Sequence, residues 1–335
     1  MRKERFMIFK QNHEKASTQH HIPSRIIHKM VGLGCPGFKF SSFDIISGGC
    51  ANLNIKLKLE GETTSLLLRI YLRDKKSAIL EQNLYKLLES KVPVPIIYYV
   101  GCVEEYCFAI CQFIEGITLR DLLLSDIPHN LEAIMQEVGL ILAKISKIEF
   151  AEAGFFDQNL NIIEETSKAS YLTFVDQLWQ NQFICQALSS TIINKIKYYL
   201  DKYAALLPGE DEKHLVHGDF DPANILVKQV DGIWKIAAIL DWEFSFSGPL
   251  MFDVANMLRY SHHMPDIFMQ SFLKGLKDGG IILPDNWQIT AHLLNLVSLL
   301  DILRRRDPKM RPNQCADTIF LIDHIITKLE IHENN

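Results

Sequence analysis

Two carboxylates, a histidine and an asparagine fall close together in HLVHGDFDPANILV, residues 214–227. Asp219, Asp221 and Asn224 stand between short apolar stretches on either side. A carboxylate can accept a proton, and carboxylate and amide oxygens are hard ligands that suit Mg²⁺. Because Asp221 precedes Pro222, we interpret it as a turn residue. Asp219 and Asn224 are therefore the first candidates for chemistry.

A further carboxylate joins them through a predicted hairpin. Residues 225–228 and 233–240 have β character, and the Asp-Gly pair at 231–232 predicts the turn between them. Folding the segment about this turn makes Asn224 and Asp241 neighbours, which gives an oxygen-donor pair for Mg²⁺. Asp219 is expected at the rim of the same site, where it can accept a proton.

The elements before this site read as strands and helices in mixed order. Helical spacing predicts a short helix over 24–31 with Ser24 as its N-cap, followed by a loop. Strands are expected over 43–47 and 53–60, joined by the glycine-rich GGCAN, and a third over 65–72. A second helix is expected over about 77–90.

The third strand and the second helix each carry a charge in apolar surroundings. Arg69 interrupts SLLLRIYL, and Glu81 lies on the apolar face of the helix because Leu84, Tyr85 and Leu88 follow at helical spacing. Burying either charge alone is costly. We therefore expect Arg69 and Glu81 to form an ion pair.

The rest of the chain suggests a change of architecture. Another hairpin is expected over 98–103 and 107–113, and Glu115-Gly116 then breaks the strand pattern. Apolar residues recur at helical spacing over 131–148 and 290–304, so the second part is predicted to be mainly helical. We place the division into an N-terminal lobe of residues 1–112 and a C-terminal lobe of residues 113–335.

The composition is that of a globular protein. Of 335 residues, 48% are hydrophobic and 22% charged, and no apolar run is long enough for a membrane helix. We expect a cytoplasmic protein with no membrane partner. The seven cysteines include no CxxC pair and are odd in number, so we interpret them as buried thiols rather than disulfides or zinc ligands.

Charge is divided unevenly along the chain. Residues 1–112 contain sixteen Lys and Arg against ten Asp and Glu, whereas residues 113–335 contain nineteen against thirty. The acidic part is expected to attract a cationic partner. Arg304-Arg305-Arg306 is interpreted as the solvated end of a helix, and we expect no nucleic-acid partner.

The motifs HGDFDPANIL and ILDWEFSFSGPLMFDVANMLR resemble those of the aminoglycoside phosphotransferase and choline kinase superfamily. The resemblance covers about residues 43 to 260 and includes the glycine turn SGGCANLNIKL and the hinge-like CQFIEGITL. It implies an α+β fold like that of protein kinases, with two lobes: an antiparallel sheet plus helix, then a mainly helical lobe.

The resemblance also implies roles for individual residues. Asp219, Asn224 and Asp241 would be catalytic, and Asn224 and Asp241 would hold Mg²⁺ on the phosphates of ATP or GTP. The nucleotide would be bound by a larger set, with Cys111 at the back of its pocket: Ser47, Gly48, Gly49, Arg69, Glu81, Gln112 and Ile114. His217 and Asp253 would be scaffold, and Glu243 either supports the metal ligands or is a second one.

The acceptor of the phosphoryl group is left open between several classes. Only twelve residues separate Asp241 from Asp253, too few for the activation segment with which a protein kinase docks a peptide, so a small molecule is favoured. A cationic aminoglycoside-type antibiotic is the first expectation, and choline, ethanolamine or another metabolite the second. Arg69, where many relatives have lysine, leaves this branch open. A regulatory nucleotide-binding pseudokinase is the alternative of another class. Oligomeric state is not indicated.

Overall fold

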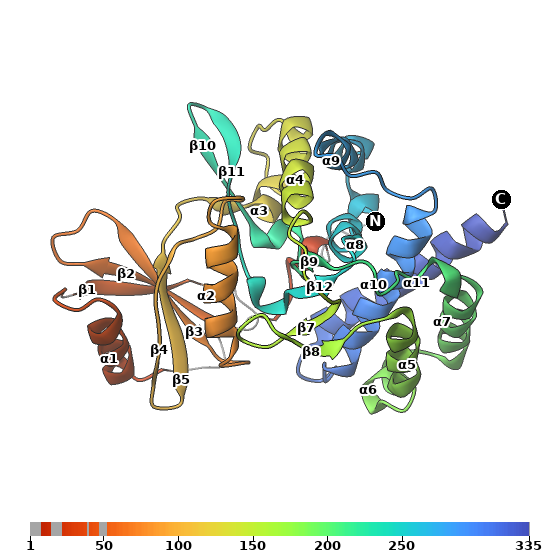
Figure 1. Cartoon of the computed structure of the whole chain (residues 1–335), viewed down its shortest axis with the longest axis horizontal. Helices are drawn as coiled ribbons and strands as arrows, with labels where there is room; N and C mark the ends of the chain where they lie inside the picture. The colour runs from red at the N-terminus through yellow and green to blue at the C-terminus, as the bar shows by residue number, and fades with distance from the viewer. Residues whose placement is uncertain (1–7, 15–21, 39, 47–51, 335) are drawn as a thin grey trace.

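The computed structural model describes residues 8–14, 22–38, 40–46 and 52–334. A sheet with two helices forms one end of the molecule, and most helices form the other (Figure 1). This arrangement is the predicted α+β fold with a sheet-rich and a mainly helical part. The lobe boundary at residues 112 and 113 stays a prediction.

The five-stranded antiparallel sheet has the order β1-β2-β3-β5-β4. Its strands are β1 (Phe40–Ile46), β2 (Asn52–Leu59), β3 (Ser65–Tyr71), β4 (Ile97–Val103) and β5 (Tyr106–Gln112). The hairpins predicted for β1 with β2 and for β4 with β5 are therefore confirmed.

A helix covers each face of this sheet. Helix α1 (Ser24–Gly34) packs on the face to which Leu68 and Ile70 of β3 point, and α2 (Ser77–Leu88) packs on the face with Tyr71. Side chains alternate along a strand, so Arg69 shares the α2 face with Tyr71. Helix α1 runs three residues beyond the predicted end, and Ser24 is its first residue rather than its N-cap, because Pro23 holds that position.

Two small sheets connect the large sheet to the helical part. The first has the order β11-β10-β6 and the second the order β8-β7-β12-β9. Their strands are β6 (Ile117–Thr118), β7 (Gly154–Phe156), β8 (Ile162–Glu165), β9 (His214–Val216), β10 (Ile225–Val230), β11 (Ile233–Ile239) and β12 (Phe246–Gly248). Asp231 and Gly232 both have positive φ in the β10–β11 turn, as the Asp-Gly signal predicted.

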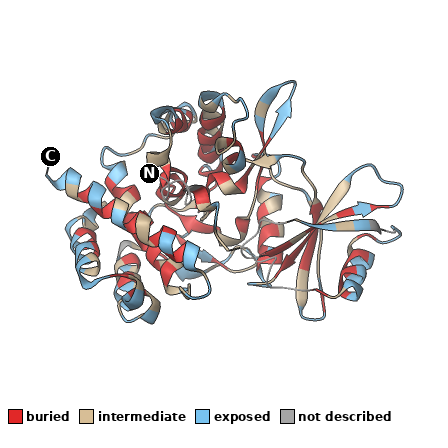
Figure 2. Cartoon of the chain, turned by 180° about the vertical axis from the view of Figure 1, so that it is seen from behind, coloured by how far each residue is buried: buried red, intermediate tan, exposed pale blue. Residues whose placement is uncertain are grey.

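The helical part surrounds α10 (Trp287–Arg304), which is buried on several sides and packs against α5, α6, α7, α8 and α11. Figure 2 shows the buried residues along the facing sides of these helices. The other helices are α3 (Leu119–Leu123), α4 (Leu131–Ile145), α5 (Lys168–Leu178), α6 (Gln182–Ala187), α7 (Ser190–Lys202), α8 (Met251–Leu258), α9 (Asp266–Asp278) and α11 (Pro312–Glu333). Short 3₁₀ helices are η2 (Ile8–Lys10), η4 (Ala204–Leu206), η5 (Pro222–Asn224), η6 (Trp242–Phe244) and η7 (Ser261–His263).

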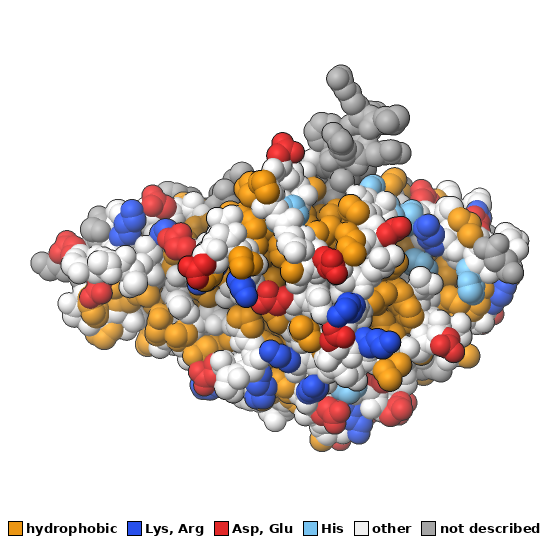
Figure 3. All heavy atoms as spheres, turned by 90° about the horizontal axis from the view of Figure 1, so that it is seen from above, with side chains coloured by type: hydrophobic (Ala, Val, Ile, Leu, Met, Phe, Trp, Pro, Cys, Tyr) orange, Lys and Arg blue, Asp and Glu red, His pale blue; other side chains and the backbone are white. Residues whose placement is uncertain are grey.

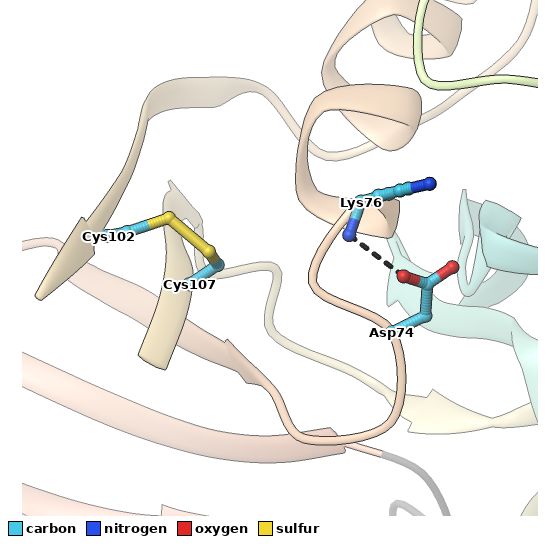
Figure 4. Close-up of a disulfide and its surroundings, with 4 residues drawn as sticks. All are labelled: Asp74, Lys76, Cys102 and Cys107. Carbon is cyan, nitrogen blue, oxygen red and sulfur yellow. Dashed lines mark hydrogen bonds between the residues drawn. A yellow bond between two sulfur atoms is a disulfide. The ribbon is translucent and has the colours of Figure 1, made fainter. Parts of the chain in front are cut away.

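The cysteines differ from the prediction. Cys102 and Cys107 form a disulfide between β4 and β5 (Figure 4), because the antiparallel register places them directly opposite each other. Cys35, Cys111 and Cys315 are buried thiols, whereas Cys185 is exposed. The prediction that no cysteines pair was therefore wrong, since spacing alone does not reveal cross-strand register.

Among the described residues, no helix combines the length and the apolar character needed to cross a membrane.

Candidate active site

A large cleft of about 1490 Å³ is lined by residues of the five-stranded sheet, of the segment after β5 and of the helical part. It contains most of the residues predicted to act together. These are Arg69, Glu81, Ile114, Asp219, Asn224 and Asp241.

The loop before η5 is held by His217, whose ring is buried. Its Nε2 donates to the carbonyl of Leu240 at 2.8 Å, and its Nδ1 accepts from the N–H of Asp219 at 3.2 Å. A carbonyl can only accept and a backbone N–H can only donate, so the ring is the neutral Nε2–H tautomer. Burial lowers the pKa of His217, which favours the same neutral form. The ring thus positions Asp219 as scaffold.

Asp253 of α8 binds the same loop from the other side. Its carboxylate accepts from the N–H of His217 at 2.7 Å and from that of Gly218 at 3.0 Å. Gly218 has φ 81°, and a Cβ at this position would lie 2.3 Å from the carbonyl oxygen of Phe244. Only glycine fits here, so the turn that presents Asp219 depends on this residue.

The β10–β11 hairpin brings Asn224 and Asp241 together as predicted. Ile225 pairs with Ile239, and the N–H of Leu240 donates to the carbonyl of Asn224 at 2.8 Å. Asp241 has φ 63°, a conformation rarely adopted by non-glycine residues and concentrated at functional sites. The hairpin therefore fixes the end of β11 beside η5.

The donor set at this point fits a Mg²⁺ ion. Asn224 Nδ2 donates to the carbonyl oxygen of Asp219 at 2.8 Å and to its Oδ2 at 3.0 Å. The amide oxygen of Asn224 then remains as its acceptor atom, and Asp241 adds a carboxylate. Two oxygen ligands from the protein, completed by phosphates and water, are typical of Mg²⁺.

Arg69 joins Asp241 to the large sheet. Its guanidinium lies 3.2 Å from Glu81 Oε1, which confirms the predicted pair, and it also contacts the carboxylate of Asp241. The hydroxyl of Tyr71 donates to Glu81 Oε2 at 2.5 Å. Burial alone would lower the pKa of Arg69, but Asp241 and Glu81 raise it well above its usual value. Arg69 is therefore a fixed cation in the cleft.

The residues predicted to contact the nucleotide do not all line the cleft. Ile114 lines the cleft together with Cys111 and Phe113, but Gln112 does not. The N–H of Gln112 donates to the carbonyl of Ile96 at 2.7 Å, because the chain there continues the β4–β5 pairing, so this donor is not available to an adenine. Ser47, Gly48 and Gly49 lie outside the described residues.

Lys10 is a site residue that the sequence did not indicate. Its Nζ lies 2.7 Å from Asp219 Oδ1 and also contacts Asp221. Phe9 is buried against Tyr260 and Phe268, with ring centroids 5.4 and 6.0 Å apart. Phe9 and Lys10 are thus anchored in the helical part.

Other polar residues complete the lining of the cleft. Asp221 caps η5 by accepting from the N–H of Ala223 at 2.8 Å, as expected of a turn residue. Glu243 accepts from Asn52 Nδ2 at 3.2 Å. Arg304 is the last residue of α10 and Arg305 is exposed, which confirms the interpretation as a solvated helix end, and Arg304, Arg305 and Arg306 also line the cleft. No local pattern distinguishes an arginine at a helix end from one that lines a cleft.

Comparison with known proteins defines the family. A sequence profile described as phosphotransferase enzyme family matches residues 42–290, which include Asp219, Asn224 and Asp241. The fold and the site agree with this match, and the chain belongs to the phosphotransferase enzyme family.

Relatives with known names match parts of the chain. Hygromycin-B 4-O-kinase of Escherichia coli is 24% identical over 183 residues, which are 50% of this chain and 48% of the relative. Acyl-CoA dehydrogenase family member 10 of Mus musculus is 24% identical over 197 residues, 57% of this chain and 17% of the relative. The match thus spans half or less of each relative's length.

Solved structures share the fold over most of the chain. A ternary complex of a thermostable mutant of aminoglycoside phosphotransferase APH(4)-Ia with ADP and hygromycin B has a TM-score of 0.69 at 19% identity, covering 91% of this chain and 98% of that one. A GDP and kanamycin complex of APH(2")-IIia has a TM-score of 0.66 at 16% identity, covering 90% and 98%.

Proposed function

We propose that the protein is an ATP- and Mg²⁺-dependent O-phosphotransferase that transfers the γ-phosphoryl group to a hydroxyl of a small molecule. The observation that carries this proposal is the convergence of Asp219, Asn224, Asp241 and Arg69 on one cleft. Phosphoryl transfer depends chiefly on positioning and on neutralising charge, and these side chains offer both.

In this proposal Asn224 and Asp241 hold Mg²⁺, which would neutralise phosphate charge. Arg69, held by Glu81, contacts the α- and β-phosphates, and the backbone at Ser47, Gly48 and Gly49 covers them. The adenine lies beside Cys111 and Ile114. Nucleotide complexes of both adenine and guanine types among the similar structures support ATP or GTP as donor.

Asp219 is proposed to accept or orient the proton of the acceptor hydroxyl. Its carboxylate is fixed by Asn224 and its backbone by His217. Burial alone would raise the pKa of Asp219, but Lys10, His217 and Arg259 together outweigh burial and lower it. The carboxylate is therefore ionised at neutral pH, as an acceptor of protons must be.

The acceptor is proposed to be a small molecule handled in the cytoplasm. The acidic balance after residue 112 and the hygromycin kinase relative support a cationic aminoglycoside, which would make the protein an antibiotic-resistance factor. Choline or ethanolamine is the alternative. Figure 3 shows acidic and basic side chains interspersed on one face of the molecule, so overall charge alone does not select between them.

An assay of ADP release tests the proposed reaction. The protein is incubated with Mg·ATP and a panel of aminoglycosides, choline, ethanolamine and sugars. Turnover that Asp219→Asn reduces at least about 100-fold, with unchanged nucleotide affinity, supports the proposal. Tight ATP binding without turnover of any compound would favour a pseudokinase, and full activity of Asp219→Asn would remove Asp219 as the base.

A further inference from the structure

Beyond Asp219, arginines from two separate parts of the molecule line the cleft. Arg73 lies in the loop between β3 and α2, next to the large sheet. Arg304 and Arg305 lie at the end of α10, and Arg306 and Arg311 follow in the loop before α11. The cations therefore approach the same cleft from the sheet and from the helical part.

Two of these arginines share one carboxylate. Arg304 Nε lies 2.7 Å from Asp301 Oδ1, and Arg305 contacts the other oxygen of the same carboxylate. One negative charge is thus shared between two guanidinium groups. Burial lowers the pKa of Arg305, and the positive charges of Arg73 and Arg304 lower it further against the opposing effect of Asp301. Arg73 and Arg305 both line the cleft, so their positive charges add to each other there.

Aromatic rings hold two of the guanidinium groups in place. Arg73 lies over the ring of Phe244 at 4.9 Å, immediately after the metal-binding turn, and Arg304 lies over Phe174 of α5 at 5.3 Å. When a guanidinium stacks on an aromatic ring, its N–H groups lie in the guanidinium plane and do not point at the ring. The groups are thus fixed without their hydrogen-bonding capacity being used by the rings.

One face of α10 connects this cluster to the catalytic loop. Ser298, Asp301 and Arg305 follow at spacings of three and four residues, so they share a face. Arg259, which is buried and bonded to Asn295, Asn256 and Ser298, lies at the start of this face. Seven residues of helix span roughly 10 Å, which is the length of a small phosphorylated or carboxylated metabolite.

Stabilisation of the helix end explains only part of the cluster. Arginines in the last turn of a helix interact favourably with its dipole, and Asp301 lies at helical spacing from both Arg304 and Arg305. Arg73 lies in the loop between β3 and α2, so the dipole of α10 does not explain its position. Its charge adds to those of Arg304 and Arg305 in the same cleft, which favours an anion there.

We propose that the acceptor of this phosphotransferase carries an anionic group, a phosphate or a carboxylate, which Arg73, Arg304 and Arg305 bind while its hydroxyl lies at Asp219. Guanidinium groups recognise either group through paired N–H bonds. The inference rests on the proposed function for the position of the hydroxyl. It replaces the expected cationic acceptor with one that carries at least one negative charge.

Binding of simple anions tests the subsite without turnover. The full chain is saturated with Mg²⁺ and the non-hydrolysable AMP-PNP, and inorganic phosphate or acetate is titrated by calorimetry. We expect Arg305→Gln and Arg73→Gln to weaken binding of one of these anions at least about tenfold. Arg25→Gln is the matched control, because Arg25 is an exposed arginine of α1 that pairs with Glu104 at 2.9 Å. Circular dichroism verifies that each variant is folded. Equal binding by wild type and Arg305→Gln, or no binding by wild type, would overturn the proposal.

Turnover of matched acceptors separates this inference from the proposed function. ADP release is compared for glycerol, glycerol 3-phosphate, glycerate and 3-amino-1,2-propanediol, and for glucose, glucose 6-phosphate, gluconate, glucosamine and kanamycin. We expect an anionic member to have the highest kcat/KM and Arg305→Gln to reduce that value at least about tenfold. A higher kcat/KM for a cationic acceptor would contradict the inference but would still support the proposed phosphotransferase function. ATP binding without turnover of any compound would contradict the proposed function itself. In that case the anion titration would still show whether Arg73 and Arg305 bind an anion.

Discussion

Lys10 and Asp219 form an ion pair in the candidate active site, with 2.7 Å between Nζ and Oδ1. Asn224 Nδ2 donates to the other carboxylate oxygen at 3.0 Å, so both oxygens of the proposed base have a partner. An acceptor hydroxyl at Asp219 would compete with Lys10 for the same carboxylate. Lys10, which is 209 residues away in sequence, thus lies where it restricts access to the proposed base.

Replacing Lys10 tests this competition. We expect Lys10→Ala to raise kcat/KM for the acceptor several-fold and to leave KM for ATP unchanged, since Lys10 contacts Asp219 and Asp221. The variant should lose about 1–3 kcal/mol in free energy of unfolding, because two partly buried carboxylates lose their cation. Steady-state kinetics and urea unfolding measure both effects. Lys10→Arg, which keeps the charge, is the control, and a fall in kcat/KM for Lys10→Ala would indicate instead that Lys10 assists catalysis.

The buried pair of Arg69 and Glu81 makes a prediction about nucleotide binding. Glu81→Gln weakens the hold on Arg69 while keeping the shape of the side chain, so we expect KM for ATP to rise about tenfold and the free energy of unfolding to fall by about 1–3 kcal/mol. The comparison variant is Glu104→Gln, an exposed carboxylate that pairs with Arg25. It should leave both quantities unchanged. An unaltered KM for Glu81→Gln would show that the pair does not serve the nucleotide.

The turn at Gly218 makes a prediction about the position of Asp219. In Gly218→Ala the new Cβ would meet the carbonyl oxygen of Phe244 at 2.3 Å, in addition to the unfavourable φ of 81°. We expect kcat to fall at least tenfold and the melting temperature to fall as well. Gly232→Ala isolates the effect of φ, because Gly232 has φ 77° and a Cβ added there would have no neighbouring atom within 4 Å. If both variants have the same kcat, the clash is not what positions Asp219.

A group of half-buried histidines makes a prediction about acid stability. The rings of His262 and His324 stack with centroids 3.8 Å apart. Burial and the neighbouring cations lower the pKa of His262 to about 3 and that of His292 to about 4. Below the ordinary histidine pKa of about 6.5 the unfolded chain therefore binds protons that the folded protein does not.

The contribution of these histidines to the free energy of unfolding should consequently fall as the pH is lowered from about 6.5 towards 4, whereas Glu243 and Asp253, whose pKa values burial raises to about 7, act in the opposite direction. Urea unfolding at pH 7.5 and at pH 5 measures this loss, and His262→Phe should reduce the difference between the two values. His28→Gln is the control, because His28 is exposed on α1. An equal loss in wild type and His262→Phe would remove His262 from the account of acid stability.

Local patterns in the sequence were sufficient wherever neighbouring elements alone decide the geometry. The Asp-Gly turn at 231–232 predicted that Asn224 and Asp241 meet, since a two-residue turn defines which residues face each other. Strand and helix periodicity predicted the pair of Arg69 and Glu81, because a buried charge needs a partner on the adjacent element. The family resemblance then indicated the fold and the reaction.

The tertiary structure decided what local patterns do not encode. Lys10 reaches Asp219 because Phe9 packs against Tyr260 and Phe268, and no periodicity links the start of the chain to these helices. The register of β4 and β5 determines that Cys102 faces Cys107. Arg73 and Arg305 line one cleft although they lie on elements far apart in the sequence. The sequence by itself therefore determined which side chains meet at Asn224 and Asp241, because neighbouring elements bring them together. The packing of distant segments determined which charged side chains line the rest of the cleft.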